Sequence, residues 1–143
     1  MPNSVDTLQK LCASGAFEEI HIVSKANTVA RAFFLLRLRS LKFWKRTGIP
    51  RKNLHFCKRH KDKAPICEKL GITDFIDDRL HVLSYLKIEG NRYALNPTRK
   101  REFKKYPETA KSVTIVASWK ELEELLLPIP ISVASFQDQG KQN

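Results

Sequence analysis

Short apolar runs alternate with longer segments in which apolar residues recur every three or four positions, from near the N-terminus to residue 127. The short runs are typical of buried β-strands, and the longer segments are typical of amphipathic helices. Strands that alternate with helices predict an α/β fold in which a parallel sheet carries helices on both faces. The expected strands are residues 17–23, 53–57, 72–76, 92–95 and 113–116, and the expected helices are residues 4–13, 27–46, 62–70, 79–86 and 118–127, with the basic segment 98–105 forming a loop or a helix.

Residues with capping chemistry stand at several of these helix ends. Asn27 has the side chain of an N-cap, and Gly71 suits the left-handed backbone that often ends a helix. Ser118 is followed three residues later by Glu121, which is the spacing of a capping box. These signals support the boundaries that the apolar pattern predicts.

The helix expected over residues 27–46 separates apolar from basic positions. Val29, Phe33, Leu36 and Trp44 share one face, which we expect to pack into the core. Lysine and arginine residues gather on the opposite face. If Trp44 is a core residue, it is not available to stack on a nucleic-acid base.

Length and composition bound the class of protein. The chain has 143 residues, of which 42% are hydrophobic, and this suits one globular domain with its own core. Residues 1–127 are expected to form the domain and residues 128–143 a largely flexible tail, in which only 129–136 is apolar enough to pack. No run is long enough to cross a bilayer and no signal peptide is visible. Three cysteines in a chain that needs no disulfide fit the cytoplasm.

Chemistry-bearing residues stand where expected strands end. Ser24 places a hydroxyl after the first strand, and Lys63 places a cation in the first turn of a helix, where it needs an anion or water nearby. Asp77 and Asp78 follow another strand, and paired hard oxygen ligands suit Mg²⁺. Ligands of parallel α/β sheets bind at the carboxyl ends of the strands. A hydroxyl, a lysine and a magnesium site together could stabilise a phosphoryl transition state. The ordinary alternative for either aspartate is to cap the helix that begins at Arg79.

Three segments resemble motifs of the haloacid-dehalogenase-like (HAD-like) hydrolases, in that family's order. Residues 20–25 resemble a strand ending in Ser or Thr, residues 62–64 a lysine at a helix start, and residues 72–79 a strand ending in an acidic pair. The resemblance implies a Rossmann-like three-layer sandwich around a parallel sheet. It implies that Ser24 and Lys63 act in catalysis and bind phosphate, and that Asp77 and Asp78 hold Mg²⁺ in a phosphohydrolase.

The chain departs from this family at its first motif. The family's central strand ends in Asp-x-Asp and supplies the nucleophile, whereas Asp6 is the only acid before the first expected strand. The sheet would therefore lack its first central strand and have an unpaired seam, with the chain inactive or truncated as written. Three explanations are open: an upstream segment, a noncatalytic relative, or another segment, such as residues 129–136 or a second chain, in the gap. Pro130 argues against residues 129–136 as a central strand.

Positive charge supports an alternative function. Lys and Arg number 26 against 15 Asp and Glu, giving a net charge of +11. A noncatalytic module could use such a surface to bind nucleic acid or another polyanion. A phosphorylated small molecule or a nucleic-acid end would be the substrate of an enzyme, and an exposed seam would favour homo-oligomers. The candidate polyanion contacts are Arg39, Lys42, Lys45, Arg46, Arg51 and Lys52.

Overall fold

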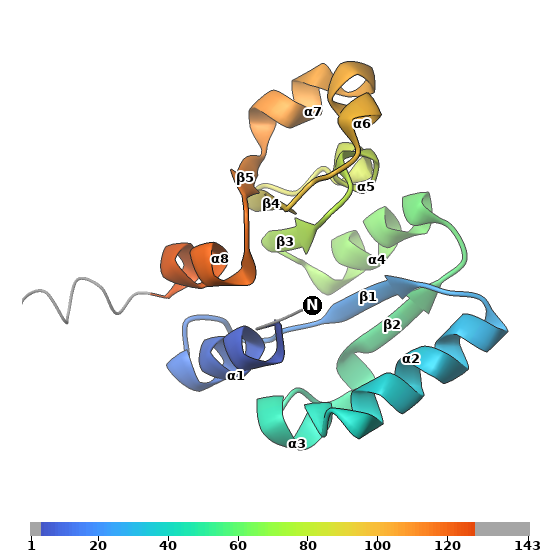
Figure 1. Ribbon diagram of the computed structural model, residues 1–143, viewed down its shortest axis with the longest axis vertical. Coiled ribbons are helices and arrows are strands. Elements are labelled where there is room, and N and C mark those ends of the chain that lie inside the picture. The colour runs from blue at the N-terminus through green and yellow to red at the C-terminus, as the bar shows by residue number, and fades with distance from the viewer. Residues whose placement is uncertain (1–3, 128–143) are drawn as a thin grey trace, which may run out of the picture.

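The computed structural model describes residues 4–127, in which helices and parallel strands alternate (Figure 1). The predicted α/β class is confirmed at this level. The helices are α1 (Ser4–Ser14), α2 (Thr28–Ser40), α3 (Phe43–Thr47), α4 (Lys63–Leu70), α5 (Leu80–Tyr85), α6 (Lys100–Lys105), α7 (Pro107–Ser112) and α8 (Trp119–Leu126), with 3₁₀ turns η1 (Arg51–Asn53) and η2 (His60–Asp62). The strands are β1 (Ile22–Lys25), β2 (Leu54–Cys57), β3 (Asp74–Asp77), β4 (Asn91–Leu95) and β5 (Thr114–Val116).

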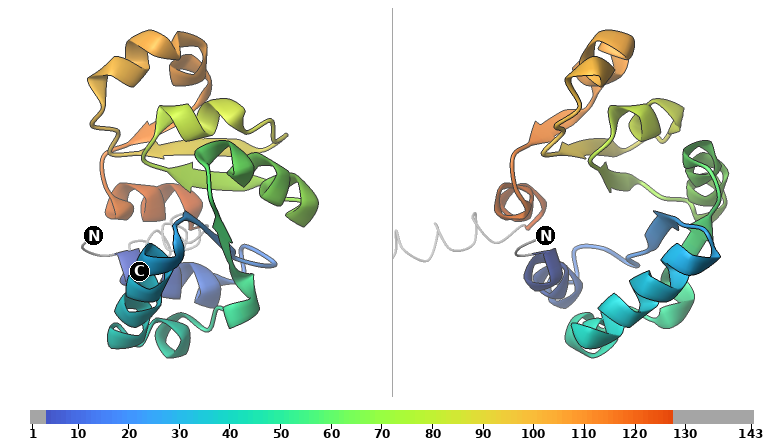
Figure 2. Two further views of the ribbon diagram at one scale, coloured as in Figure 1. Left: turned by 90° about the vertical axis from the view of Figure 1, so that its right-hand side faces the viewer. Right: turned by 45° about the vertical axis from the view of Figure 1, so that its right-hand side comes forward.

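The strands form two parallel sheets rather than the single predicted sheet. β1 pairs with β2, with Ser24 opposite Phe56, and β3, β4 and β5 pair in that order. The division falls between β1 and β3. Figures 1 and 2 show the two sheets in separate halves of the molecule, with α4 beside both.

Helices from one half pack against the other half. α4 follows β2 and contacts β1, yet its fully buried Cys67 lies in a core cluster with Leu80, Leu83 and Ala94 of the second half. On the other side α1 meets α8, where Thr7 Oγ1 donates to Glu123 Oε1 over 3.2 Å. These contacts connect the halves although no strand pairing joins β1 to β3 among the described residues.

The predicted helix caps are present. The Asn27 side chain accepts a hydrogen bond from the Ala30 amide (2.8 Å), and Gly71 has a φ of 68° at the end of α4. Ser118 Oγ accepts from the Glu121 amide (3.1 Å), while Glu121 in turn accepts from the amide of Ala117 rather than that of Ser118. Local capping chemistry therefore places these helix ends correctly.

The helix predicted over residues 27–46 is wrong in its length and in its buried face. It breaks at Lys42, whose φ is 53°, and continues as α3. Val29, Phe33 and Leu36 are 64%, 68% and 60% exposed. The opposite face, with buried Leu38, packs against the core instead, because α2 can present only one side to the first sheet.

Other boundaries also move. The first strand begins at Ile22 rather than at residue 17 and continues through Lys25, so Ser24 lies within the strand and not after it. The basic segment 98–105 contains α6, and α7 follows it without having been predicted. None of the described helices has the length and apolarity needed to cross a membrane. The predicted tail, including residues 129–136, lies outside the described residues.

Candidate functional site

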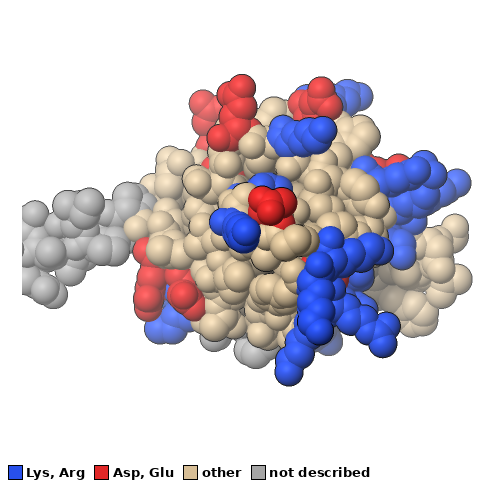
Figure 3. All heavy atoms as spheres, turned by 90° about the horizontal axis from the view of Figure 1, so that it is seen from above, with Lys and Arg blue, Asp and Glu red and all other residues tan. Residues whose placement is uncertain are grey.

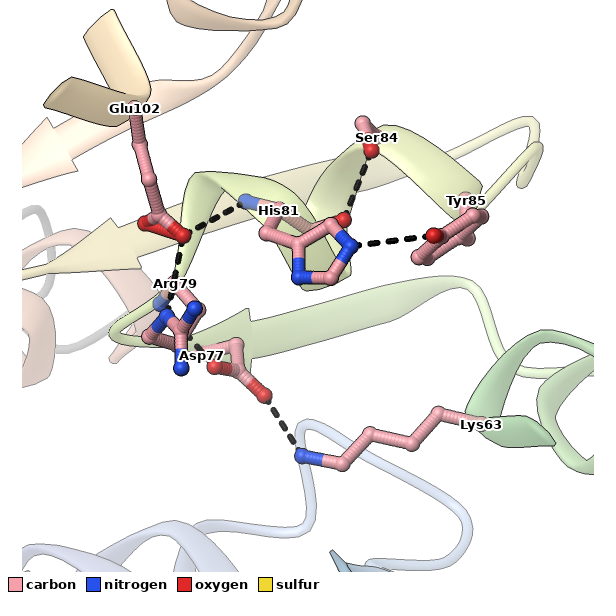
Figure 4. A network of polar contacts seen from close by, with 7 residues as sticks. All are labelled: Lys63, Asp77, Arg79, His81, Ser84, Tyr85 and Glu102. Carbon is pink, nitrogen blue, oxygen red and sulfur yellow. Dashed lines mark hydrogen bonds and ion pairs between the residues drawn. The ribbon is translucent and has the colours of Figure 1, made fainter. Parts of the chain in front are cut away.

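A buried ion pair joins the carboxyl edges of the two sheets. Lys63 begins α4, six residues after β2 ends, and Asp77 is the last residue of β3. Lys63 Nζ lies 2.8 Å from Asp77 Oδ2, and the two side chains are only 10% and 8% exposed. The structure thus supplies the anion that a lysine in the first turn of a helix needs, and Figure 4 shows the pair in its surroundings.

Asp77 also organises the chain that follows it. Its second oxygen, Oδ1, accepts a hydrogen bond from the backbone amide of Arg79 (3.0 Å) at the start of α5. This bond lies in the turn before α5, whose N-cap is Arg79 and has no side-chain capping bond, so the predicted capping role of Asp77 is not observed. Both oxygens of the carboxylate have a protein partner.

A second ion pair holds Arg79 in place. Arg79 Nε donates to Glu102 Oε1 over 2.9 Å, and the backbone amide of His81 donates to the same oxygen over 3.3 Å. Glu102 comes from α6 and is buried. Figure 4 shows the resulting chain of contacts, which runs from α4 through β3 and α5 to α6.

Burial controls the titration of Asp77. It raises the pKa of this carboxyl above its usual value, and the neighbouring Asp78 adds to the rise, while the Lys63 ammonium opposes it. A carboxylate in a low-dielectric site loses water that would stabilise its charge. The charged form of Asp77 thus relies on Lys63 and on the amide of Arg79.

His60 lies among the cations of this edge. Its Nδ1 is buried and has no hydrogen-bond partner within residues 4–127, and its ring meets that of His81 edge-on with centroids 5.8 Å apart. Burial lowers the pKa of His60, and the positive charges of Lys25, Lys63 and Arg79 lower it further. The neutral form of His60 is therefore favoured at this edge.

The other two predicted site residues, Ser24 and Asp78, are not part of the Lys63–Asp77 ion pair. Ser24 is half-buried in β1, one residue before Lys25, and its hydroxyl makes no hydrogen bond to Lys63 or Asp77 in the described part of the chain. Asp78 is exposed at the end of β3. The structure joins Lys63 to Asp77 directly and does not bring Ser24 into contact with either of them.

The adjacent carboxylates are donors of the type that Mg²⁺ takes, but both oxygens of Asp77 already have protein partners. Mg²⁺ is commonly bound through one or two carboxylates and keeps several waters. Asp77 and the exposed Asp78 supply two carboxylates. Residues 4–127 contain no group of three or more His, Cys, Asp and Glu side chains placed to hold a metal.

The predicted polyanion contacts are all at the surface. Arg39, Lys42 and Lys45 are exposed around the α2–α3 break. Figure 3, which views the molecule from the α6–α7 end, shows Lys and Arg side chains gathered toward one side of that face. Two other members have partners of their own. Arg46 forms an ion pair with Asp6, and the guanidinium of Arg51 lies 5.7 Å from the centroid of the Trp44 ring. Lys52, the last member, is exposed.

Sequence reasoning missed Glu102, Arg79 and His60 as parts of this edge. A signal exists for Glu102, which is the one acid within the basic segment 98–105. Arg79 and His60 carry no comparable signal, because their partners are set by packing between distant segments. No known family model matches the chain, and no curated protein or solved structure shows significant similarity to it.

Proposed function

We propose that the chain is a HAD-like, Mg²⁺-dependent phosphohydrolase scaffold that binds a phosphoryl group at the carboxyl edge of its sheets. The observation that supports this most is the buried 2.8 Å contact between Lys63 and Asp77, two residues that the family resemblance assigns to one site. They are 14 positions apart in sequence and belong to α4 and β3. The three-layer Rossmann-like sandwich belongs to the same proposal.

Each residue takes the role that the family resemblance implies for it. The Ser24 hydroxyl would donate to a phosphoryl oxygen, and Lys63 would stabilise negative charge on the same group. Asp77 and Asp78 would hold Mg²⁺, which supplies charge neutralisation when bound. The substrate would be a phosphorylated small molecule or the phosphorylated end of a nucleic acid.

The scaffold is expected to lack turnover by itself. In the family, an aspartate at the end of the central strand attacks phosphorus. Asp6, the acid of α1, forms an ion pair with Arg46. No strand of the described chain lies between β1 and β3 to bring such an aspartate to the edge. Binding of phosphate and hydrolysis of a phosphate ester should therefore be separable.

The test measures both properties on the purified full chain. Inorganic phosphate is titrated by calorimetry with Mg²⁺ and with chelator, and hydrolysis of a generic phosphate ester is followed under the same conditions. We expect Mg²⁺-dependent phosphate binding that weakens in Asp78→Asn and Ser24→Ala but not in Glu124→Gln, an exposed acid on α8. If phosphate affinity is the same with Mg²⁺ and with chelator, and is unchanged in both site variants, the proposed phosphate-binding scaffold is refuted. Turnover that needs Mg²⁺ and Asp78 would refute its predicted inactivity.

A noncatalytic polyanion-binding module is the second candidate. The observation that favours it is the exposure of the six basic residues around α2, α3 and η1. Each neutralised phosphate releases counterions, so this function predicts oligonucleotide affinity that falls steeply between about 50 and 200 mM salt. Fluorescence anisotropy with a labelled oligonucleotide measures it. We expect Lys42→Gln with Lys45→Gln to reduce both affinity and salt slope, and affinity that stays flat with salt would exclude the module.

A further inference from the structure

The outer face of α2 is apolar, and the described part of the chain leaves it uncovered. Val29, Phe33 and Leu36 stand at positions i, i+4 and i+7 of the helix and so form one stripe along it. All three are exposed, and α2 lies at the outside of the first sheet in Figures 1 and 2. Single exposed apolar residues are ordinary, whereas a contiguous apolar patch on a soluble protein marks an interaction site.

A groove lies beside this stripe, between α2 and the first turn of α1. Its volume is about 680 Å³. Phe33 belongs both to the stripe and to the groove, while Val5, Leu38 and Leu41 form apolar parts of the walls. The stripe and the groove are therefore one continuous surface, which we call the α2 surface. Its concave part can receive a projecting side chain, as in the recognition of a helix by a groove.

Cations that have no ion-pair partner in the described chain border the α2 surface. Residues 20–61 contain no Asp or Glu. Arg37 lines the groove, Arg39 lies on the other side of the stripe, and Lys42 follows the end of the helix. All three are exposed, and none of them is ion-paired to a described acid. The surface therefore combines apolar contact area with available positive charge.

These available cations lie toward the C-terminal end of α2. Arg31, in the first half of the helix, is engaged with the ring of Phe56, whose centroid lies 5.1 Å from the guanidinium carbon. Arg46, at the groove, is paired with Asp6. Acidic residues are favoured in the first turn of a helix. A partner helix that runs antiparallel to α2 would bring an acidic first turn to the available cations, and its own apolar stripe would lie along that of α2.

We propose that the α2 surface binds an antiparallel α-helix of another protein, acidic in its first turn and apolar along one face. Residues 128–143 match this description poorly, because Pro128 and Pro130 interrupt helical hydrogen bonding and the one acid, Asp138, follows the apolar run. A second copy of the chain is disfavoured by the net charge of +11 on each copy. The inference goes beyond phosphoryl chemistry, and it differs from polyanion binding because it requires the exposed apolar stripe.

The probe is the N-acetylated peptide Asp-Glu-Leu-Glu-Glu-Leu-Leu-Ala-Gln-Leu-Ala-Gln-Ala-Gln, labelled with fluorescein at its C-terminus and added to the full chain. Its leucines have helical spacing, and its acids stand at the start. Fluorescence anisotropy at about 50 mM salt measures binding, and circular dichroism measures the helix that the peptide gains. We expect saturable binding with a gain in helicity. The reversed sequence, and a peptide with Asn and Gln in place of its acids, should bind at least about fivefold more weakly.

Matched variants of the chain locate the site. Phe33→Ser should weaken peptide binding at least about tenfold, whereas Leu125→Ser, at an exposed apolar position of α8, should leave it within about twofold. Arg37→Gln should weaken binding at least about threefold, and Lys104→Gln, the same charge change on α6, should leave it within about twofold. Thermal melting verifies that all four variants fold. Affinity for phosphate or an oligonucleotide should not change in Phe33→Ser, so this inference is tested separately from both proposed functions.

Four results would overturn the proposal. The first is no saturable binding, or equal binding of the reversed and uncharged peptides. The second is binding of the chain to phosphatidylserine vesicles that Phe33→Ser abolishes, which would assign the α2 surface to a membrane. The third is a concentration-dependent dimer that Phe33→Ser abolishes, which would assign the surface to a second copy. The fourth is tighter peptide binding by Val133→Lys, which would show that residues 128–143 compete for the surface.

Discussion

Lys63 and Asp77 form a buried ion pair between the helix that follows the first sheet and the last residue of the second sheet's first strand. The pair is both an electrostatic necessity for Asp77 and a physical connection between the two halves. Removing one partner of a buried pair leaves the other charge without compensation, which costs far more than removing an exposed pair.

Lys63→Met should therefore lower the free energy of unfolding by about 3–5 kcal/mol, because Asp77 stays buried without its ammonium. Urea unfolding followed by circular dichroism measures the change. Lys63→Met combined with Asp77→Asn should recover much of the loss, since the asparagine oxygen can still accept from Arg79. Lys111→Met, at an exposed pair with Glu108, is the control and should have little effect. If Lys63→Met is as stable as the parent chain, Lys63 and Asp77 do not form a buried ion pair.

Acidification should weaken the fold through His60. Its pKa is lower in the folded chain than the ordinary value of 6.5, so the unfolded chain binds a proton more readily. This contribution to stability is complete above pH 6.5 and is lost as the pH falls through the lower, folded pKa. Urea midpoints between pH 7.5 and 5 measure the loss, which should be smaller in His60→Gln. The slope that remains belongs in part to His55, whose pKa burial also lowers. Equal slopes in both proteins would exclude the His60 contribution.

The three cysteines should react with thiol reagents in a fixed order. Burial raises the pKa of Cys67 to about 11, and the side chain is fully buried in the core beside Leu80. Cys12 is only half-buried and should react first, followed by Cys57. Mass spectrometry after timed iodoacetamide labelling measures the order. Labelling of Cys67 in the folded chain as fast as Cys12 would show that α4 does not pack as described.

Substitutions on the two faces of α2 should differ sharply in their cost. Phe33→Ser removes a side chain that is 68% exposed and should change the unfolding free energy by less than about 0.5 kcal/mol. Leu38→Ala opens a cavity beside Phe43 and Ile49 and should cost about 2–5 kcal/mol. Chemical denaturation of both variants provides the comparison. If Phe33→Ser lowers the unfolding free energy more than Leu38→Ala does, the buried face of α2 is the one that the apolar pattern predicts.

That reversal shows where sequence reasoning stops for this helix. α2 carries apolar residues on both sides, with Val29 and Phe33 on one and Phe34 and Leu38 on the other. Periodicity identifies an apolar stripe, but it cannot decide which of two stripes meets the sheet when both exist. The choice is made by packing, where Phe34 meets Phe56 edge-on and Leu38 joins the core.

Local chemistry was more informative than periodicity at the ends of elements. Asn27, Gly71 and Ser118 set helix ends through contacts with residues near them in sequence, and these could be predicted. The position of Lys63 in the first turn of α4 predicts an anion or water nearby, but that position alone does not identify Asp77 as the partner. Glu102 meets Arg79 across 23 positions, and only the folded chain brings them together.

The contact between α1 and α8 has a consequence for synthesis on the ribosome. Thr7 bonds to Glu123, which is 116 positions later, so the first helix cannot complete its packing until the last helix has been made. Translation adds about 5–20 residues per second, which leaves α1 waiting for several seconds. During that time α1 can pack against α3, where Leu8 meets the cluster of Leu38 and Phe43, but its contact with α8 is not yet possible. Closure of this domain therefore has to follow the synthesis of α8.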